Sequence, residues 1–111
     1  MNVRWRSQFK KDYRRIMKQG KDISKLDYVI EELAVPNPLL EQYRDHYLIG
    51  EWAGYKECHI EPDWLLIYDY ETLDDSEHQL LLVRTGSHSD LLEQFLQQTV
   101  KRALQKISNI F

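Results

Sequence analysis

The chain has 111 residues, of which 42% are hydrophobic and 30% are charged, and this composition predicts a single ordered globular domain. Its only cysteine, Cys58, excludes an intramolecular disulfide and suits a reducing compartment. No stretch approaches the roughly 18 consecutive apolar residues of a membrane span, and charged residues follow the N-terminus where a secretory signal needs an apolar segment. We therefore expect a soluble, cytoplasmic protein that does not associate with membranes.

The charge is distributed unevenly along the chain, although the net charge is only -3. Residues 1–26 carry a net charge of +7, residues 27–80 carry -12 and residues 81–111 carry +2. The negative total argues against a protein that coats nucleic acid by bulk electrostatic attraction. The basic first quarter could still hold a polyanion in one orientation, whereas two solvated helix faces would give the same pattern.

Two helices are predicted in the first third of the chain. Apolar residues at helical spacing precede Gly20 and predict a helix over residues 8–19. A second stripe follows Asp22 or Ser24, either of which can cap it, and ends at Val35 because two prolines follow. The apolar positions of the two stripes are Phe9, Tyr13, Ile16 and Met17, and then Ile23, Leu26, Ile30 and Leu33. The short link between the stripes predicts a helical hairpin.

Three strands are predicted after an irregular segment over residues 39–50. Residues 55–61 alternate in polarity, which directs Cys58 to the core and His59 to the opposite face. Residues 64–68 are apolar throughout, as in a central strand, and residues 79–84 form a third strand that ends at Gly86.

Apolar residues at near-helical spacing after Ser89 predict a further, C-terminal helix. The order of these elements predicts an α+β fold, in which an N-terminal helical hairpin packs on one face of a small antiparallel β-sheet. The other face of the sheet is expected to stay open, and it is where a functional site could be built.

Histidines are the main candidates for chemistry, because the sequence contains no phosphate loop, dinucleotide-binding glycine fingerprint, G-x-S-x-G elbow or C-x-x-C pair. His46, His59 and His88 lie beside predicted turns or on an outward strand face. Taken singly, each is better explained as a surface or capping histidine. Together with Asp63, which follows His59 across a tight turn, they could form one cluster at an end of the sheet.

Such a cluster suits RNA cleavage, which needs a base for the 2′-hydroxyl, an acid for the leaving 5′-oxygen and a cation near the phosphorus. Imidazole can act as acid or base near neutrality. Arg84 could contact the phosphate, and Trp64 or Tyr68 could stack on a base, although both aromatic residues could equally belong to the core. We expect no metal and no cofactor, because Cys58 faces away from the histidines and no H-x-x-x-H pair is present.

Short motifs of one known family occur in order over residues 3–92. The most specific are H-x-E-P-D-W at residues 59–64 and R-T-G-x-H at residues 84–88. The others include Phe9-Lys10-Lys11-Asp12, Asp45-His46, Gly50-Glu51-Trp52 and Gly54-Tyr55. With these motifs the sequence resembles the YafQ branch of the RelE/ParE superfamily of toxins from type II toxin-antitoxin systems.

The resemblance implies a RelE-like fold and a ribosome-dependent endoribonuclease, an mRNA interferase that inhibits translation without a metal and is neutralised by a cognate antitoxin. Its partners would be that antitoxin, the ribosome and mRNA. Motif positions give His88 as the principal catalytic residue and His46, His59 and Asp63 as its companions. Arg84 matches a phosphate-contacting arginine, and Glu57 and Trp64 are further substrate-binding candidates.

Two features depart from the family pattern. Leu92 stands where relatives carry a phenylalanine, and if that ring stacks on substrate, Leu92 weakens RNA binding here. The chain then continues, so we divide it into a toxin domain over residues 1–92 and a C-terminal helical extension over residues 93–111. That extension could pack over the sheet, form a homodimer or add to the antitoxin interface.

Two alternative functions remain open. The first is a catalytically weak or inactive homologue that acts as an antitoxin-binding, regulatory module, which Leu92, the acidic middle of the chain and the added C-terminal tail would fit. The second is a metal-dependent hydrolase, whose activity would be lost to chelators and restored by zinc.

Overall fold

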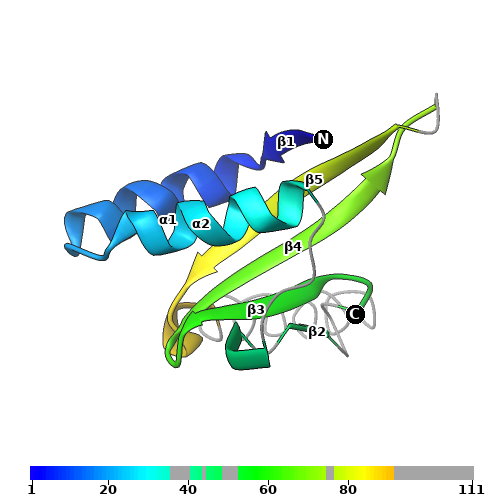
Figure 1. The fold of residues 1–111 in the computed structure, drawn as a ribbon. Coiled ribbons are helices and arrows are strands. Elements are labelled where there is room, and N and C mark those ends of the chain that lie inside the picture. The colour runs from blue at the N-terminus through cyan, green and yellow to red at the C-terminus, as the bar shows by residue number, and fades with distance from the viewer. Residues whose placement is uncertain (36–40, 44, 49–52, 75–76, 92–111) are drawn as a thin grey trace, which may run out of the picture.

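The computed structural model describes residues 1–35, 41–43, 45–48, 53–74 and 77–91. Two helices lie along one face of a sheet whose two longest strands form an extended hairpin (Figure 1). In chain order the elements are β1 (Asn2–Trp5), α1 (Ser7–Lys18), α2 (Ile23–Ala34), the 3-10 turn η1 (Glu41–Tyr43), β2 (His46–Tyr47), β3 (Lys56–Glu61), β4 (Trp64–Thr72) and β5 (His78–Gly86). The strand order across the sheet is β1-β5-β4-β3-β2.

The predicted α+β fold, with a helical hairpin on one face of the sheet, is confirmed. The sheet is mixed rather than antiparallel, because β1 pairs in parallel with β5, placing Val3 opposite Leu80. Strands β1 and β2 were not predicted, since strands of four and two residues are too short to show a period. Residues 88–91 form a helical turn, and the rest of the expected C-terminal helix, including Leu92, lies outside the described residues.

Helix α1 buries Phe9, Asp12 and Ile16, which lie on one face at helical spacing. Met17, which the sequence analysis placed in the apolar stripe, is 54% exposed. The aspartate takes the buried position instead because it pairs with Arg84 of β5, a partner that the local pattern cannot reveal.

Helix α2 begins after Asp22, whose carboxylate accepts a hydrogen bond from the backbone N–H of Ser24 at 3.1 Å. This confirms one of the two predicted caps. Contact with the Ser24 hydroxyl, followed by its backbone N–H, lowers the pKa of the Asp22 carboxyl. The helix buries Leu26, Val29 and Leu33 against the sheet.

The core is divided between the two faces of the sheet. The larger cluster, which includes Cys58, Trp64 and Tyr68, lies between the helices and the sheet. The opposite face carries a second apolar cluster made of Leu65, Ile67, Leu81, Val83 and Leu91, with Leu48 and Tyr55 packed against it. The middle of this face is therefore buried rather than open as expected, and polar side chains occupy its β2–β3 side.

Burial of Cys58 in the larger cluster confirms its predicted direction and raises the pKa of its thiol. Within the described part of the chain, no helix combines the length and the apolar character that crossing a membrane requires.

We expect Thr85→Val to lower the free energy of unfolding by about 1–3 kcal/mol. The Thr85 hydroxyl is fully buried, accepts from the Trp64 indole N–H at 3.0 Å and donates to the Leu65 carbonyl at 2.7 Å. Valine keeps the shape but leaves both buried groups without this partner. Urea denaturation followed by circular dichroism measures the change, with Thr72→Val, at an exposed position of β4, as the matched control. Equal effects of the two substitutions would contradict this role of the hydroxyl.

Candidate functional site

Three of the candidate side chains lie on the sheet face away from the helices. His46 of β2 stands directly opposite Glu57 of β3 in the antiparallel register. His59 lies two residues further along β3, so it shares a face with Glu57, while Cys58 between them points into the core. The pleat of one strand and one cross-strand pair are therefore sufficient to bring the three together.

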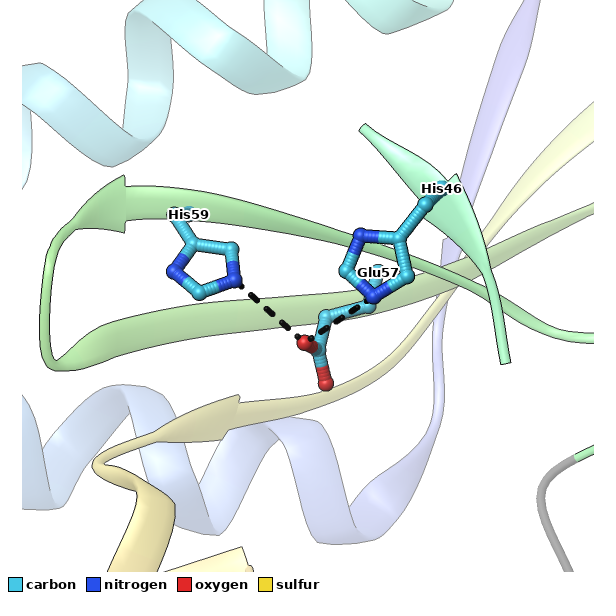
Figure 2. A group of neighbouring side chains, drawn as sticks. All are labelled: His46, Glu57 and His59. Carbon is cyan, nitrogen blue, oxygen red and sulfur yellow. Dashed lines mark ion pairs between the residues drawn. The ribbon is translucent and has the colours of Figure 1, made fainter. Parts of the chain in front are cut away.

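Both imidazoles face one carboxylate oxygen (Figure 2). Glu57 Oε1 lies 3.6 Å from His46 Nε2 and 3.5 Å from His59 Nε2. The side chain of His46 is 47% exposed, whereas those of Glu57 and His59 are 13% and 12% exposed. Glu57 and His59 are therefore largely buried, whereas solvent has access to the cluster at His46.

His88 lies next to this cluster and is held by Asp63. Its ring nitrogen Nδ1 is 2.6 Å from Asp63 Oδ1, and its backbone N–H donates to the same oxygen at 2.9 Å. These contacts, the backbone one first, lower the pKa of the Asp63 carboxyl. The ring centroids of His59 and His88 are 5.7 Å apart, and those of His46 and His59 are 6.1 Å apart. Three imidazoles thus lie in succession along one surface.

The chain after β5 is shaped to present His88. Gly86 has φ of +155°, which L residues rarely adopt, and a Cβ there would stand 2.6 Å from the Arg15 guanidinium. The Ser87 hydroxyl accepts from the Asp90 N–H at 3.2 Å, and the Asp90 carboxylate accepts from the Ser87 N–H at 3.3 Å. This reciprocal capping starts the helical turn over residues 88–91 and places His88 at its first position.

Asp45 anchors the short strand that carries His46. Its carboxylate accepts from Lys56 Nζ at 2.8 Å and from the Tyr68 hydroxyl. Burial, followed by this contact with Asp45, raises the pKa of Tyr68. This role of Asp45 was not predicted, although the residue stands directly before a candidate histidine in the sequence. A strand of two residues needs such an anchor to hold its imidazole in place.

The other predicted substrate contacts are placed differently. Arg84 is 5% exposed and binds Asp12 through Nε at 2.7 Å and Nη2 at 3.2 Å, so it joins β5 to α1 inside the protein. This buried ion pair does not fit the predicted phosphate contact. Trp64 and Tyr68 have no exposed surface, so both belong to the core, the alternative considered from the sequence. Neither leaves a ring face on which a base could stack. The structure therefore brings together His46, His59, Asp63, His88 and Glu57, but not Arg84 or Trp64.

The lowered pKa of Asp63 predicts a pH dependence of stability. Because the pKa is below the unfolded value of about 3.9, the ionised carboxylate stabilises the fold above that pH and loses its contribution as the pH falls through the folded pKa. We expect the urea midpoint of the wild type to exceed that of Asp63→Asn at about pH 6 and to approach it below about pH 3.9. Circular dichroism over this range measures both. A difference that stays constant with pH would show that ionised Asp63 is not held by His88.

Comparison with known proteins agrees with the motifs. A family model described as a bacterial toxin of type II toxin-antitoxin systems, YafQ, matches residues 1–93. The mRNA interferase toxin YafQ of Escherichia coli strain K12 is 38% identical over 92 residues, which are 81% of this chain and 94% of that protein.

Solved structures show the same fold. A metal-bound toxin from Helicobacter pylori has a TM-score of 0.72 and 37% identity, covering 82% of this chain and 98% of that one. A chain of the Escherichia coli DinJ-YafQ complex has a TM-score of 0.66 and 38% identity, covering 81% of this chain and 96% of that one. From its motifs, its fold and these matches, the chain belongs to the YafQ family of toxins from bacterial type II toxin-antitoxin systems.

Proposed function

We propose that this toxin is an endoribonuclease that cuts mRNA on the ribosome by metal-independent acid/base chemistry. The observation that carries the proposal is the convergence of three imidazoles on one solvent-accessible surface, where His46 and His59 face the carboxylate of Glu57 and His88 faces that of Asp63. The related Escherichia coli protein is an mRNA interferase by name, which supports the same activity here.

The proposed reaction is attack of a 2′-hydroxyl on the adjacent phosphorus, with cleavage of the bond from phosphorus to the 5′-oxygen. His59 takes the proton of the 2′-hydroxyl, and Glu57 stabilises the imidazolium that forms. His88, held through Nδ1 by Asp63, donates a proton from Nε2 to the leaving 5′-oxygen. The products are a 2′,3′-cyclic phosphate and a 5′-hydroxyl, and each histidine ends in the protonation state from which the other began.

His46 is the proposed phosphate contact, in place of the buried Arg84. Of the two imidazoles that face Glu57, that of His46 is more exposed to solvent than that of His59. A protonated ring there can stabilise charge that develops on the phosphoryl oxygens. Asp45 keeps this ring in position through its bonds to Lys56 and Tyr68.

A cavity beside His59 is the proposed place for a nucleotide base. It has a volume of about 390 Å³ and is lined by Lys25, Gln42, Tyr43, His59, Ile60, Glu61 and Pro62. Tyr43 offers an aromatic side chain, and Lys25, whose Nζ lies 3.8 Å from Glu61 Oε1, offers a cation at the same cavity. Tyr43 thereby replaces Trp64 and Tyr68 as the candidate stacking residue.

The outer face of α1 is the proposed contact with ribosomal RNA. Lys10, Lys11, Arg14 and Lys18 are all exposed on this helix. Since the middle of the chain is strongly acidic, attraction to RNA would be confined to this surface and would weaken as salt rises.

Neutralisation by a cognate antitoxin is also proposed, supported by the DinJ-YafQ complex of the Escherichia coli relative. Homodimer formation through residues 93–111 stays a prediction, because those residues lie outside the described ones.

The function is tested with the purified full chain, translating ribosomes and a defined message. We expect internal cuts with 5′-hydroxyl ends, no cuts in the same RNA without ribosomes, and no loss of activity to a transition-metal chelator that leaves Mg²⁺ in place. Addition of the antitoxin should stop cleavage. An intact message together with tight antitoxin binding would instead establish the inactive, regulatory module, and activity lost to the chelator would establish a metal-dependent hydrolase.

A further inference from the structure

The side chains of His46, Glu57 and His59 bring three metal-ligating groups together. One ligand atom from each residue lies within 4.8 Å of the other two. Two imidazoles and one carboxylate are the donors of many protein sites for Zn²⁺ and neighbouring transition metals. The three residues come from two paired strands, so their spacing is fixed by backbone hydrogen bonds rather than by a loop.

The distances fit an ion better than they fit direct hydrogen bonds. Glu57 Oε1 is 3.5 Å from one Nε2 and 3.6 Å from the other, beyond the 2.7–3.2 Å of a good N–H···O bond. Tetrahedral Zn²⁺ with bonds of about 2.0–2.1 Å separates its ligand atoms by about 3.3 Å. The carboxylate therefore needs to move only a few tenths of an ångström, together with a rotation that brings the two imidazoles closer.

We propose that His46, Glu57 and His59 bind one divalent transition-metal ion and that this ion inhibits the toxin. The partly exposed His46 gives the ion access from solvent, and a fourth position stays open to water. His88 is outside the set because its Nδ1 is bound to Asp63.

Inhibition follows from which atoms the ion would occupy, and this step depends on the proposed nuclease function. Coordination through Nε2 removes the lone pair with which His59 takes the 2′ proton. It also removes Glu57 from the imidazolium that this carboxylate would otherwise stabilise. The ion and a productively bound RNA would therefore compete for the same side chains.

The surroundings of His59 predict reversible binding rather than a permanent structural ion. A metal-binding histidine normally donates its other ring N–H to an acceptor. Among the described residues, none accepts a hydrogen bond from His59 Nδ1, which is buried. Coordination through Nε2 places a proton on this nitrogen without a partner, which weakens the site.

The binding step is tested by calorimetric titration of the full chain with Zn²⁺ after treatment with a chelator. We expect one ion per chain and at least about tenfold weaker binding for each of His46→Ala, Glu57→Gln and His59→Ala. Bound Co²⁺ should give the visible absorption of a four-coordinate site in the wild type and lose it in those variants.

Two histidine variants serve as matched controls. His78→Ala removes an exposed histidine at the opposite end of β5, and His88→Ala removes the neighbouring imidazole without removing a ligand. Both should bind Zn²⁺ as the wild type does. Absence of binding in the wild type, or equal binding in all variants, would overturn the metal site.

The inhibition step is tested in the ribosome assay with wild type and His78→Ala. Cleavage should fall over the Zn²⁺ range that saturates the site and return when the ion is chelated, while added Mg²⁺, a hard ion that prefers oxygen ligands, should not reproduce the effect. Cleavage that is unchanged or increased at saturation would overturn inhibition. If no cleavage occurs with or without Zn²⁺, the nuclease function fails, and the titration still decides the metal site.

Discussion

Replacing His88 with alanine is expected to reduce message cleavage by about 10²- to 10⁴-fold, the usual contribution of one acid or base group. The Asp63 carboxylate fixes Nδ1 of this imidazole at 2.6 Å, so Nε2 is the nitrogen that can reach a leaving oxygen. Alanine removes that proton donor but keeps the backbone N–H, from which Asp63 also accepts a hydrogen bond. Rates of cleavage in the ribosome assay, taken at saturating toxin, measure the loss.

The fold should survive this substitution, because the His88 side chain is 56% exposed. His78→Ala, which removes another exposed histidine, should keep full activity and is the matched control. Asp63→Asn should give an intermediate loss, since it leaves the imidazole in place but weakens its orientation and the stabilisation of its charge. Full activity of His88→Ala with an intact fold would remove His88 from the reaction.

Replacing Asp12 with alanine is expected to lower the free energy of unfolding by about 3–5 kcal/mol. The Asp12 carboxylate has no exposed surface and accepts from Arg84, from Arg15 and from the backbone N–H of Thr85. Alanine leaves the Arg84 guanidinium, 5% exposed, without its main counter-charge inside the protein. Urea denaturation followed by circular dichroism measures the difference.

Two further variants separate the ion pair from a general effect on the helices. Asp27→Ala, at an exposed position of α2, should change stability by no more than about 0.5 kcal/mol. The double variant Asp12→Leu with Arg84→Met should recover part of the loss, because it removes both buried charges and fills their volume. A loss below about 1 kcal/mol for Asp12→Ala would show that Arg84 does not depend on this carboxylate.

The same ion pair connects the fold to the site. Arg84 and Thr85 bind Asp12 of α1 immediately before Gly86 turns the chain toward His88. The position of His88 therefore depends on a contact between residues that are 72 positions apart in the sequence. Arg84 belongs to the same R-T-G-x-H motif as His88, and it is buried because it binds Asp12.

Local patterns were sufficient for much of the fold. Apolar periodicity and the residues Asp22 and Gly20 located α1 and α2, and alternation along β3 correctly assigned Cys58 to the core. Both signals are carried within a few residues of chain, so no long-range information was needed. The same alternation placed His59 on the opposite face of the sheet.

The edges of the sheet and the buried charges could not be predicted in this way. Strand β1 exists because it pairs with β5, and Asp12 is buried because Arg84 meets it there. Neither partner is near in the sequence, and the helical stripe therefore wrongly included Met17. A buried aspartate at a helical position has no local signature.

The candidate site shows the same division. The sequence by itself determined the residue types, the turn between His59 and Asp63, and the glycine that allows the chain to present His88. Only the tertiary structure decided that Glu57 stands between His46 and His59, that Asp63 holds His88, and that Arg84 and Trp64 are buried. The physical reason is that strand register and ion pairing join distant residues, whereas periodicity and turn preferences act between near neighbours.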